Sequence, residues 1–190
     1  MSNINSKSFC KIFKTITVVQ CFRNAALNAR LLSIFGSLLL CYFPLVLKAS
    51  VEKVTFPPSN EIDRADFYCW KPNSNPKGVL VLVPGLNGNG KDLIEQQKWK
   101  AFATENQLGL IGVSLASDKY LLKEGKGYYN AAGESGQMLL DVVQEKFGED
   151  VPLFIYGFSG GAHFTSNFVL WKPERVTGWC AYSAAWWGGC

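Results

Sequence analysis

Five consecutive residues, Gly157-Phe158-Ser159-Gly160-Gly161, form the pattern G-x-S-x-G. A serine in this pattern can attack a carbonyl carbon, because the flanking glycines permit a sharp turn that exposes the hydroxyl oxygen. An apolar strand, VPLFIYGF at 151–158, precedes the motif, and a helix is expected from about Gly160 to Trp171. The Gly160 N–H would then lie at a helix start, where negative charge is stabilised. We predict Ser159 as a nucleophile and Gly160 as a donor to its oxyanion.

A second loop supports this hypothesis. The residues PGLNGNG, 84–90, follow the apolar strand GVLVLV. A flexible glycine-rich loop at this point can bring one more backbone N–H over the serine and complete an oxyanion hole. We predict Leu86 as that donor, with Asn87 as the second choice.

The segments GFSGGA and PGLNGNG, about 75 residues apart, resemble those of the α/β-hydrolase family. The pattern is similar to the branch that holds secreted polyester depolymerases, feruloyl-type esterases and related serine peptidases. The resemblance covers roughly residues 51–187, and Pro84-Gly85 stands where relatives often have His-Gly. It implies a sheet whose second strand runs antiparallel and whose fifth strand precedes the serine. It also implies a small-molecule or polymeric ester as the substrate, or less favourably a peptide.

The acid and the base of a catalytic triad are not evident. In this family they follow the serine in the order acid, then histidine, but the one histidine is His163 and the one acid after Ser159 is Glu174. His163 lies four residues into the expected helix, about 6 Å down its axis, and is expected to pack rather than react. Glu174 precedes a strand and belongs at the opposite end of the sheet.

We therefore expect a C-terminally truncated hydrolase domain whose acid and base lie beyond Cys190, which makes the 190-residue chain itself inactive. The alternative is a non-catalytic pseudo-hydrolase, a binding domain tethered at the membrane. Trp186 and Trp187 would follow the last strand at the active-site end. They are predicted to flank the substrate pocket, with packing at the sheet edge as the alternative.

The segment Gly85 to Lys91 also fits the phosphate-binding pattern G-x-x-x-x-G-K. That pattern requires Ser or Thr after the lysine to hold Mg²⁺, and here the next residue is Asp92, whose charge would repel phosphate. A nucleotide-binding interpretation is therefore disfavoured.

The elements that must position these residues alternate between strand and helix signals. This pattern predicts an α/β fold with a mostly parallel sheet and helices on both faces, like an α/β-hydrolase that lacks its last strands. The expected strands are 51–56, 64–70, 78–84, 108–115, 151–158 and 175–183, and the expected helices are 92–106, 136–147 and 160–171.

The N-terminal residues 1–50 carry six Lys or Arg and no acid, whereas residues 51–190 carry thirteen Lys or Arg and fifteen Asp or Glu. The net charge of +4 thus belongs to the leader, and the body has no basic cluster suited to nucleic acid. The apolar run Leu31 to Leu47 predicts a signal peptide and a secreted or periplasmic product. The alternative is a retained anchor that contacts the membrane through the same run. Residues 51–190 are expected to be the N-terminal part of a hydrolase domain.

No cofactor or metal is expected. A single histidine excludes a multi-histidine metal site, and no CxxC pattern occurs. Three of the six cysteines lie in the leader and three, Cys69, Cys180 and Cys190, in the body. Cys69 and Cys180 fall within strand-like runs, where a small buried apolar role is expected.

Overall fold

The computed structural model describes residues 50–72 and 75–184. In this part of the chain six strands form one sheet, in the order β1-β2-β4-β3-β5-β6. The strands are β1 (Val51–Phe56), β2 (Arg64–Trp70), β3 (Gly78–Val83), β4 (Leu108–Ala116), β5 (Leu153–Phe158) and β6 (Val176–Tyr182). The helices are α1 (Gly90–Ile94), α2 (Gln97–Glu105), α3 (Lys119–Lys123), α4 (Glu134–Phe147) and α5 (Gly160–Trp171), with 3₁₀ turns η1 (Gly127–Tyr129) and η2 (Pro173–Arg175).

Strand direction places the functional loops at one end of the sheet. β2 runs antiparallel to both β1 and β4, whereas β3, β4, β5 and β6 are parallel. The carboxyl ends of the parallel strands and the first residue of β2, Arg64, therefore meet at the same edge. The mostly parallel sheet, the antiparallel second strand and the position of Ser159 after the fifth strand confirm the fold expected from the sequence.

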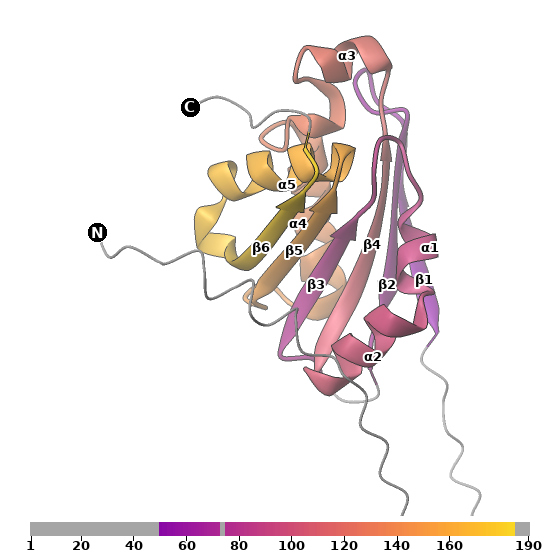
Figure 1. The fold of residues 1–190 in the computed structure, drawn as a ribbon, viewed down its shortest axis with the longest axis vertical. Helices are drawn as coiled ribbons and strands as arrows, with labels where there is room; N and C mark the ends of the chain where they lie inside the picture. The colour runs from indigo at the N-terminus through magenta and orange to yellow at the C-terminus, as the bar shows by residue number, and fades with distance from the viewer. Residues whose placement is uncertain (1–49, 73–74, 185–190) are drawn as a thin grey trace, which may run out of the picture. The chain divides into compact units, whose positions relative to one another are not determined.

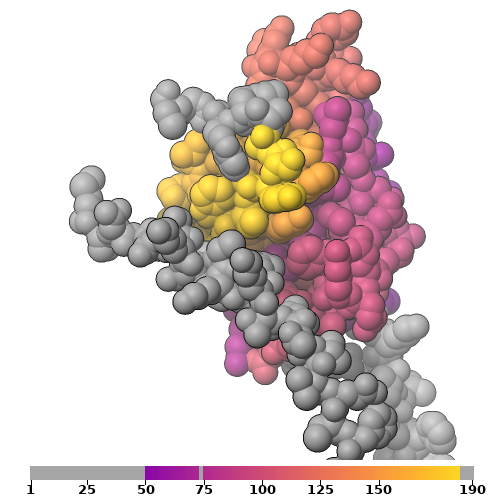
Figure 2. Space-filling model, in the orientation of Figure 1, coloured from indigo at the N-terminus to yellow at the C-terminus, as the bar shows by residue number. Residues whose placement is uncertain are grey.

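Alternate residues of the central strands contribute to two apolar cores, one on each face of the sheet, because successive side chains in a strand point to opposite faces. Val79, Val81 and Val83 of β3 face a core that includes Leu139 of α4 and Phe164 of α5. Leu80 and Leu82 face a second core, which contains Ile94 of α1 and Ala103 of α2. Helices thus cover both faces (Figure 1), and side chains fill the space between the ribbons (Figure 2).

The helix expected over 92–106 is wrong in one respect: it is two helices. Gly90 is pressed so closely against Gly112 and Val113 of β4 that a Cβ there would overlap their backbone. α1 is thereby held on the sheet. It ends at Ile94 with Glu95 as its C-cap, and Gln96 is extended with ψ of 126°. The turn lets Trp99 of α2 reach Tyr156 of β5, with ring centroids 5.3 Å apart.

Three further points concern the cysteines, helix α3 and the leader. Cys69 is buried as expected, while Cys180 is only half-buried. Helix α3 was not foreseen. The leader through residue 49, with the apolar run Leu31 to Leu47, lies outside the described residues. Within residues 50–72 and 75–184, no helix combines the length and the apolar character needed to cross a membrane.

Candidate functional site

Ser159 occupies a strained turn between β5 and α5. Its backbone has φ of 51° and ψ of −114°, a conformation that non-glycine residues rarely adopt and that costs roughly 1–3 kcal/mol. The side chain is half-buried. The turn therefore presents the Ser159 hydroxyl at the carboxyl edge of the sheet, in the strand, turn and helix setting that the motif predicts.

Two glycines make this turn sterically feasible. A Cβ on Gly157 would overlap the carbonyl oxygen of Gly161 and the hydroxyl of Thr165. A Cβ on Gly161 would overlap the carbonyl oxygens of Val83 and Pro84, at the end of β3. The first and last residues of the motif must therefore be glycines, because the backbone of the turn packs against the start of α5 and against the end of β3.

The loop after β3 lies directly over this turn. A Cβ on Gly160 would stand 2.8 Å from the Leu86 nitrogen, and a Cβ on Gly85 would stand 3.7 Å from the Ser159 Cβ. Gly160 is the first residue of α5, so its N–H has no acceptor within the helix. The Leu86 N–H has no acceptor among the described residues. The structure therefore brings together Ser159, Gly160 and Leu86, the three residues that the sequence singled out.

Asn87, the second choice for the donor, has a different place in the loop. Its φ is 51°, and its side chain pairs with the backbone of Ser117: Asn87 Nδ2 donates to the Ser117 oxygen, and the Ser117 N–H donates to Asn87 Oδ1, both at 3.2 Å. Its N–H donates a long bond, 3.4 Å, to the Tyr128 hydroxyl. These contacts tie down the loop, and the Asn87 N–H already has an acceptor.

The Arg64 side chain also holds this loop. Its Nη2 donates to the carbonyl oxygens of Asn87 and Gly88, at 2.7 and 2.8 Å. Tyr128 is buried, and burial raises the pKa of its hydroxyl well above the ordinary value, so the hydroxyl stays protonated at neutral pH. The Arg64 cation and the neutral Tyr128 hydroxyl thus hold the loop together with the pairing of Asn87 and Ser117.

Three residues next to the Ser159 turn carry exposed apolar side chains. Leu86, Phe158 and Tyr182 are 47%, 43% and 61% exposed. The rings of Phe158 and Tyr182 stack at 6.0 Å with an interplanar angle of 27°. An apolar or aromatic group of a ligand would lose unfavourable hydration by packing on them.

The two residues that the sequence analysis set aside as base and acid, His163 and Glu174, lie at different places in the fold. His163 is buried within α5, its ring lies 4.9 Å from that of Tyr129, and burial lowers its pKa. Glu174 lies in η2, before β6 and so at the far end of the sheet, 3.9 Å from the Lys172 amine. Trp186 and Trp187 lie outside the described residues.

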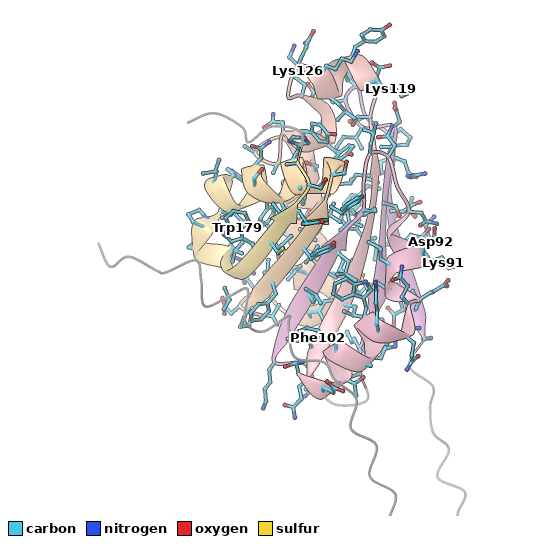
Figure 3. All side chains as sticks on the ribbon, viewed as in Figure 1. Lys91, Asp92, Phe102, Lys119, Lys126 and Trp179 are labelled. Carbon is cyan, nitrogen blue, oxygen red and sulfur yellow. The ribbon has the colours of Figure 1, made fainter. Side chains whose placement is uncertain are left out.

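The phosphate-binding interpretation gains no support from the geometry. Lys91 lies 3.6 Å from Glu95, both half-exposed, and Lys91 and Asp92 project from the outer side of α1 (Figure 3). Within the described ranges, no group of three or more His, Cys, Asp or Glu is arranged to hold a metal ion. A polar hollow lined by residues that include Gln144, Glu174 and Arg175 lies at the end of the sheet opposite Ser159.

Sequence reasoning missed Arg64, Tyr128, Phe158 and Tyr182. Arg64 had a usable signal, because the first residue of an antiparallel strand must lie at the carboxyl edge of its parallel neighbours. Phe158 stands inside the motif itself. Tyr128 gave no sequence signal, since it lies in the 3₁₀ turn η1, which the sequence did not predict.

Comparison with known proteins supports the fold. No protein-family model matches the chain, and comparison with curated sequences gives no match. Solved structures do match. A poly(3-hydroxybutyrate) depolymerase from Bordetella parapertussis aligns with a TM-score of 0.54 and 14% identity over 73% of this chain. An acetyl xylan esterase from Aspergillus awamori aligns with 0.54 and 20% over 73%, and a ferulic acid esterase with 0.55 and 16% over 74%.

These alignments cover 53%, 53% and 60% of the three matched structures, so the chain spans little more than half of their length. With the strand order and the position of the serine turn, they establish that the chain has the α/β-hydrolase fold.

Proposed function

We propose that Ser159 is the nucleophile of a serine hydrolase that cleaves an ester bond. The observation that carries this proposal is the strained Ser159 backbone, with φ of 51°, next to the N–H groups of Gly160 and Leu86, for which the described residues supply no acceptor. Strain of this kind persists only where surrounding structure enforces it, and it gathers at functional sites. The matched structures are those of two esterases and a depolymerase, which favours an ester over a peptide.

In the proposed reaction, Ser159 Oγ attacks the ester carbonyl carbon while a base accepts its proton, and the carbonyl oxygen becomes an oxyanion. The N–H groups of Gly160 and Leu86 would donate to that oxyanion. Collapse of the tetrahedral intermediate expels the alcohol, which takes the proton back, and leaves an acyl ester on Ser159. Water then attacks this ester by the same route, releasing the carboxylic acid and restoring the serine.

We propose that the base is an imidazole from outside this sequence, since its one histidine is buried in α5. We propose that an Asp or Glu and then a His follow in a longer protein. The stacked Phe158 and Tyr182, with Leu86, would receive the apolar part of a small-molecule or polymeric ester. We also propose that the protein is exported, on the basis of the leader sequence.

A second candidate function is a non-catalytic binding domain of the same fold. The exposed apolar side chains around Ser159 favour it, because they would bind an ester whether or not a base is present. Reading the coding sequence downstream of Cys190 separates the two functions: an acidic codon and then a histidine codon within about a hundred codons support the hydrolase.

Labelling with a fluorophosphonate probe tests the nucleophile. The 190-residue chain should label faintly, since an oxyanion hole and binding alone leave roughly 10³–10⁴ of rate acceleration. A form that includes the downstream acid and histidine should label rapidly at Ser159. Ser159→Ala should abolish that label, and Ser183→Ala, at an exposed serine, should not. An extended form that does not label would support the binding domain, and rapid labelling of the 190-residue chain would show that it contains a base.

A further inference from the structure

Arg64 is the first residue of β2, and its side chain contacts the loop that carries Leu86. Because β2 is antiparallel to β4, this first residue stands at the same edge of the sheet as Ser159. The Arg64 side chain has no carboxylate within ion-pairing distance among the described residues, and its Nε is buried without a hydrogen-bond partner. Its positive charge is therefore directed at the two carbonyl oxygens that it contacts, those of Asn87 and Gly88.

The first of these contacts begins a chain of hydrogen bonds that ends at Leu86. Arg64 Nη2 donates to the Asn87 oxygen at 2.7 Å. That oxygen belongs to the same peptide group as the Gly88 N–H, which donates to the Gly85 oxygen at 2.9 Å. The Gly85 oxygen in turn belongs to the same peptide group as the Leu86 N–H. Two amides thus connect the guanidinium to the proposed oxyanion donor.

Such a chain changes the strength of its last donor. A hydrogen bond to a carbonyl oxygen draws electron density through the conjugated amide and leaves its N–H more positive. A charged donor has a larger effect than a neutral one. In both peptide groups the carbonyl oxygen is nearer to Arg64 along the series of hydrogen bonds and the N–H is farther from it. The two effects therefore add at the Leu86 N–H.

We infer that Arg64 is a positioning residue that polarises the Leu86 N–H through the Asn87–Gly88 and Gly85–Leu86 peptide groups, and so strengthens the oxyanion hole. The consequence for catalysis rests on the proposed function, but the polarisation itself does not. The pairing of Asn87 with Ser117 keeps the first amide in place, since it fixes Asn87 at its unfavourable φ.

The experiment measures backbone amide proton NMR shifts in the 190-residue chain. Arg64→Gln should move the Leu86 and Gly88 amide protons upfield, because the charge at the head of the chain is gone. Arg64→Lys retains a cation that can reach one carbonyl and should give a smaller displacement. Arg175→Gln, at the far end of the sheet, is the matched control and should leave both amides unchanged. Thermal unfolding of each variant shows whether the fold is intact.

A kinetic arm uses the extended protein with its downstream acid and histidine. There Arg64→Gln should lower kcat about tenfold with little change in KM, since a weakened donor acts on the transition state and not on substrate binding. The affinity for a boronic acid that forms a tetrahedral adduct should fall by the same factor.

The outcomes separate the two proposals. If the extended protein hydrolyses no ester, the proposed function fails, and the amide shifts alone decide the role of Arg64. If the Leu86 shift is the same in Arg64→Gln as in the parent, the polarisation is refuted. If Arg64→Lys displaces Leu86 as much as Arg64→Gln does, charge is not the cause, and the inference is likewise overturned.

Discussion

The backbone N–H of Ser159 donates a 2.8 Å hydrogen bond to the carbonyl oxygen of Tyr182. Tyr182 is the last residue of β6, so the pairing of β5 with β6 continues one residue past the end of β5 and into the turn. On the β3 side of the turn, Gly161 packs closely against the carbonyl oxygens of Val83 and Pro84. The serine conformation is therefore fixed by both strands that neighbour β5.

This strain should be measurable at Ser159 itself. Ser159→Gly removes the Cβ that makes a φ of 51° unfavourable, whereas Ser159→Ala retains it. We expect the glycine variant to be more stable than the alanine variant by about 1 kcal/mol, in denaturant unfolding, although neither keeps the nucleophile. Equal stability of the two variants would show that the turn carries no strain.

Close packing at the turn leads to a second expectation. Gly161→Ala should destabilise the fold by about 3 kcal/mol, because the new methyl group overlaps two carbonyl oxygens that belong to β3 and its loop. Gly125→Ala is the control: it has φ of 71° but nothing within 4 Å of the added Cβ. It should lose only about 1 kcal/mol, the conformational cost. Chemical denaturation measures both, and similar losses would contradict the steric argument.

Much of this fold could be predicted because its central strands are short continuous apolar runs. Strands β3 and β4 are buried on both faces and β5 is buried on one, so their apolar sequences carry a strong signal over six to nine residues. The break at Glu95–Gln96 could not be predicted. It lies one turn after Gly90, whose close approach to β4 is a contact between residues distant in sequence.

The site was partly predictable for the same reason. Ser159, Gly160 and Leu86 could be named because each lies in a local glycine-rich pattern next to a strand. The residues that hold the loop after β3 in place could not be recognised together from the sequence. Arg64, Ser117 and Tyr128 come from three separate segments, and only the folded sheet brings them to Asn87.

Buried groups with raised pKa values predict sensitivity to alkali. Burial raises the pKa of the Cys69 thiol to about 12, and it also raises those of the Tyr128 and Tyr129 hydroxyls. In the unfolded chain these groups release protons near their ordinary values of 9.0 and 10.0. The unfolded state therefore binds fewer protons above about pH 9, and the free energy of unfolding falls as pH rises.

Thermal unfolding between pH 7 and pH 11 measures this effect, where the Tm should begin to fall above about pH 9. Cys69→Ala should lower the Tm at neutral pH but decline less steeply above about pH 9, since the group that titrates first is gone. A Tm that rises with pH over this window would contradict the assignment.

The edge of the sheet at β6 gives the last prediction. Among the described residues β6 pairs only with β5, and its Trp179 is 44% exposed (Figure 3). An unpaired apolar strand is a template for pairing with another chain, and a charged side chain on it opposes that pairing. We expect the 190-residue chain to self-associate and Trp179→Lys to raise the monomer fraction in sedimentation velocity. Leu170→Lys, which places the same charge on α5 at a residue 69% exposed, should have little effect. If the parent chain sediments as a single monomeric species, or if the two lysine variants behave alike, the edge of β6 is not the site of association.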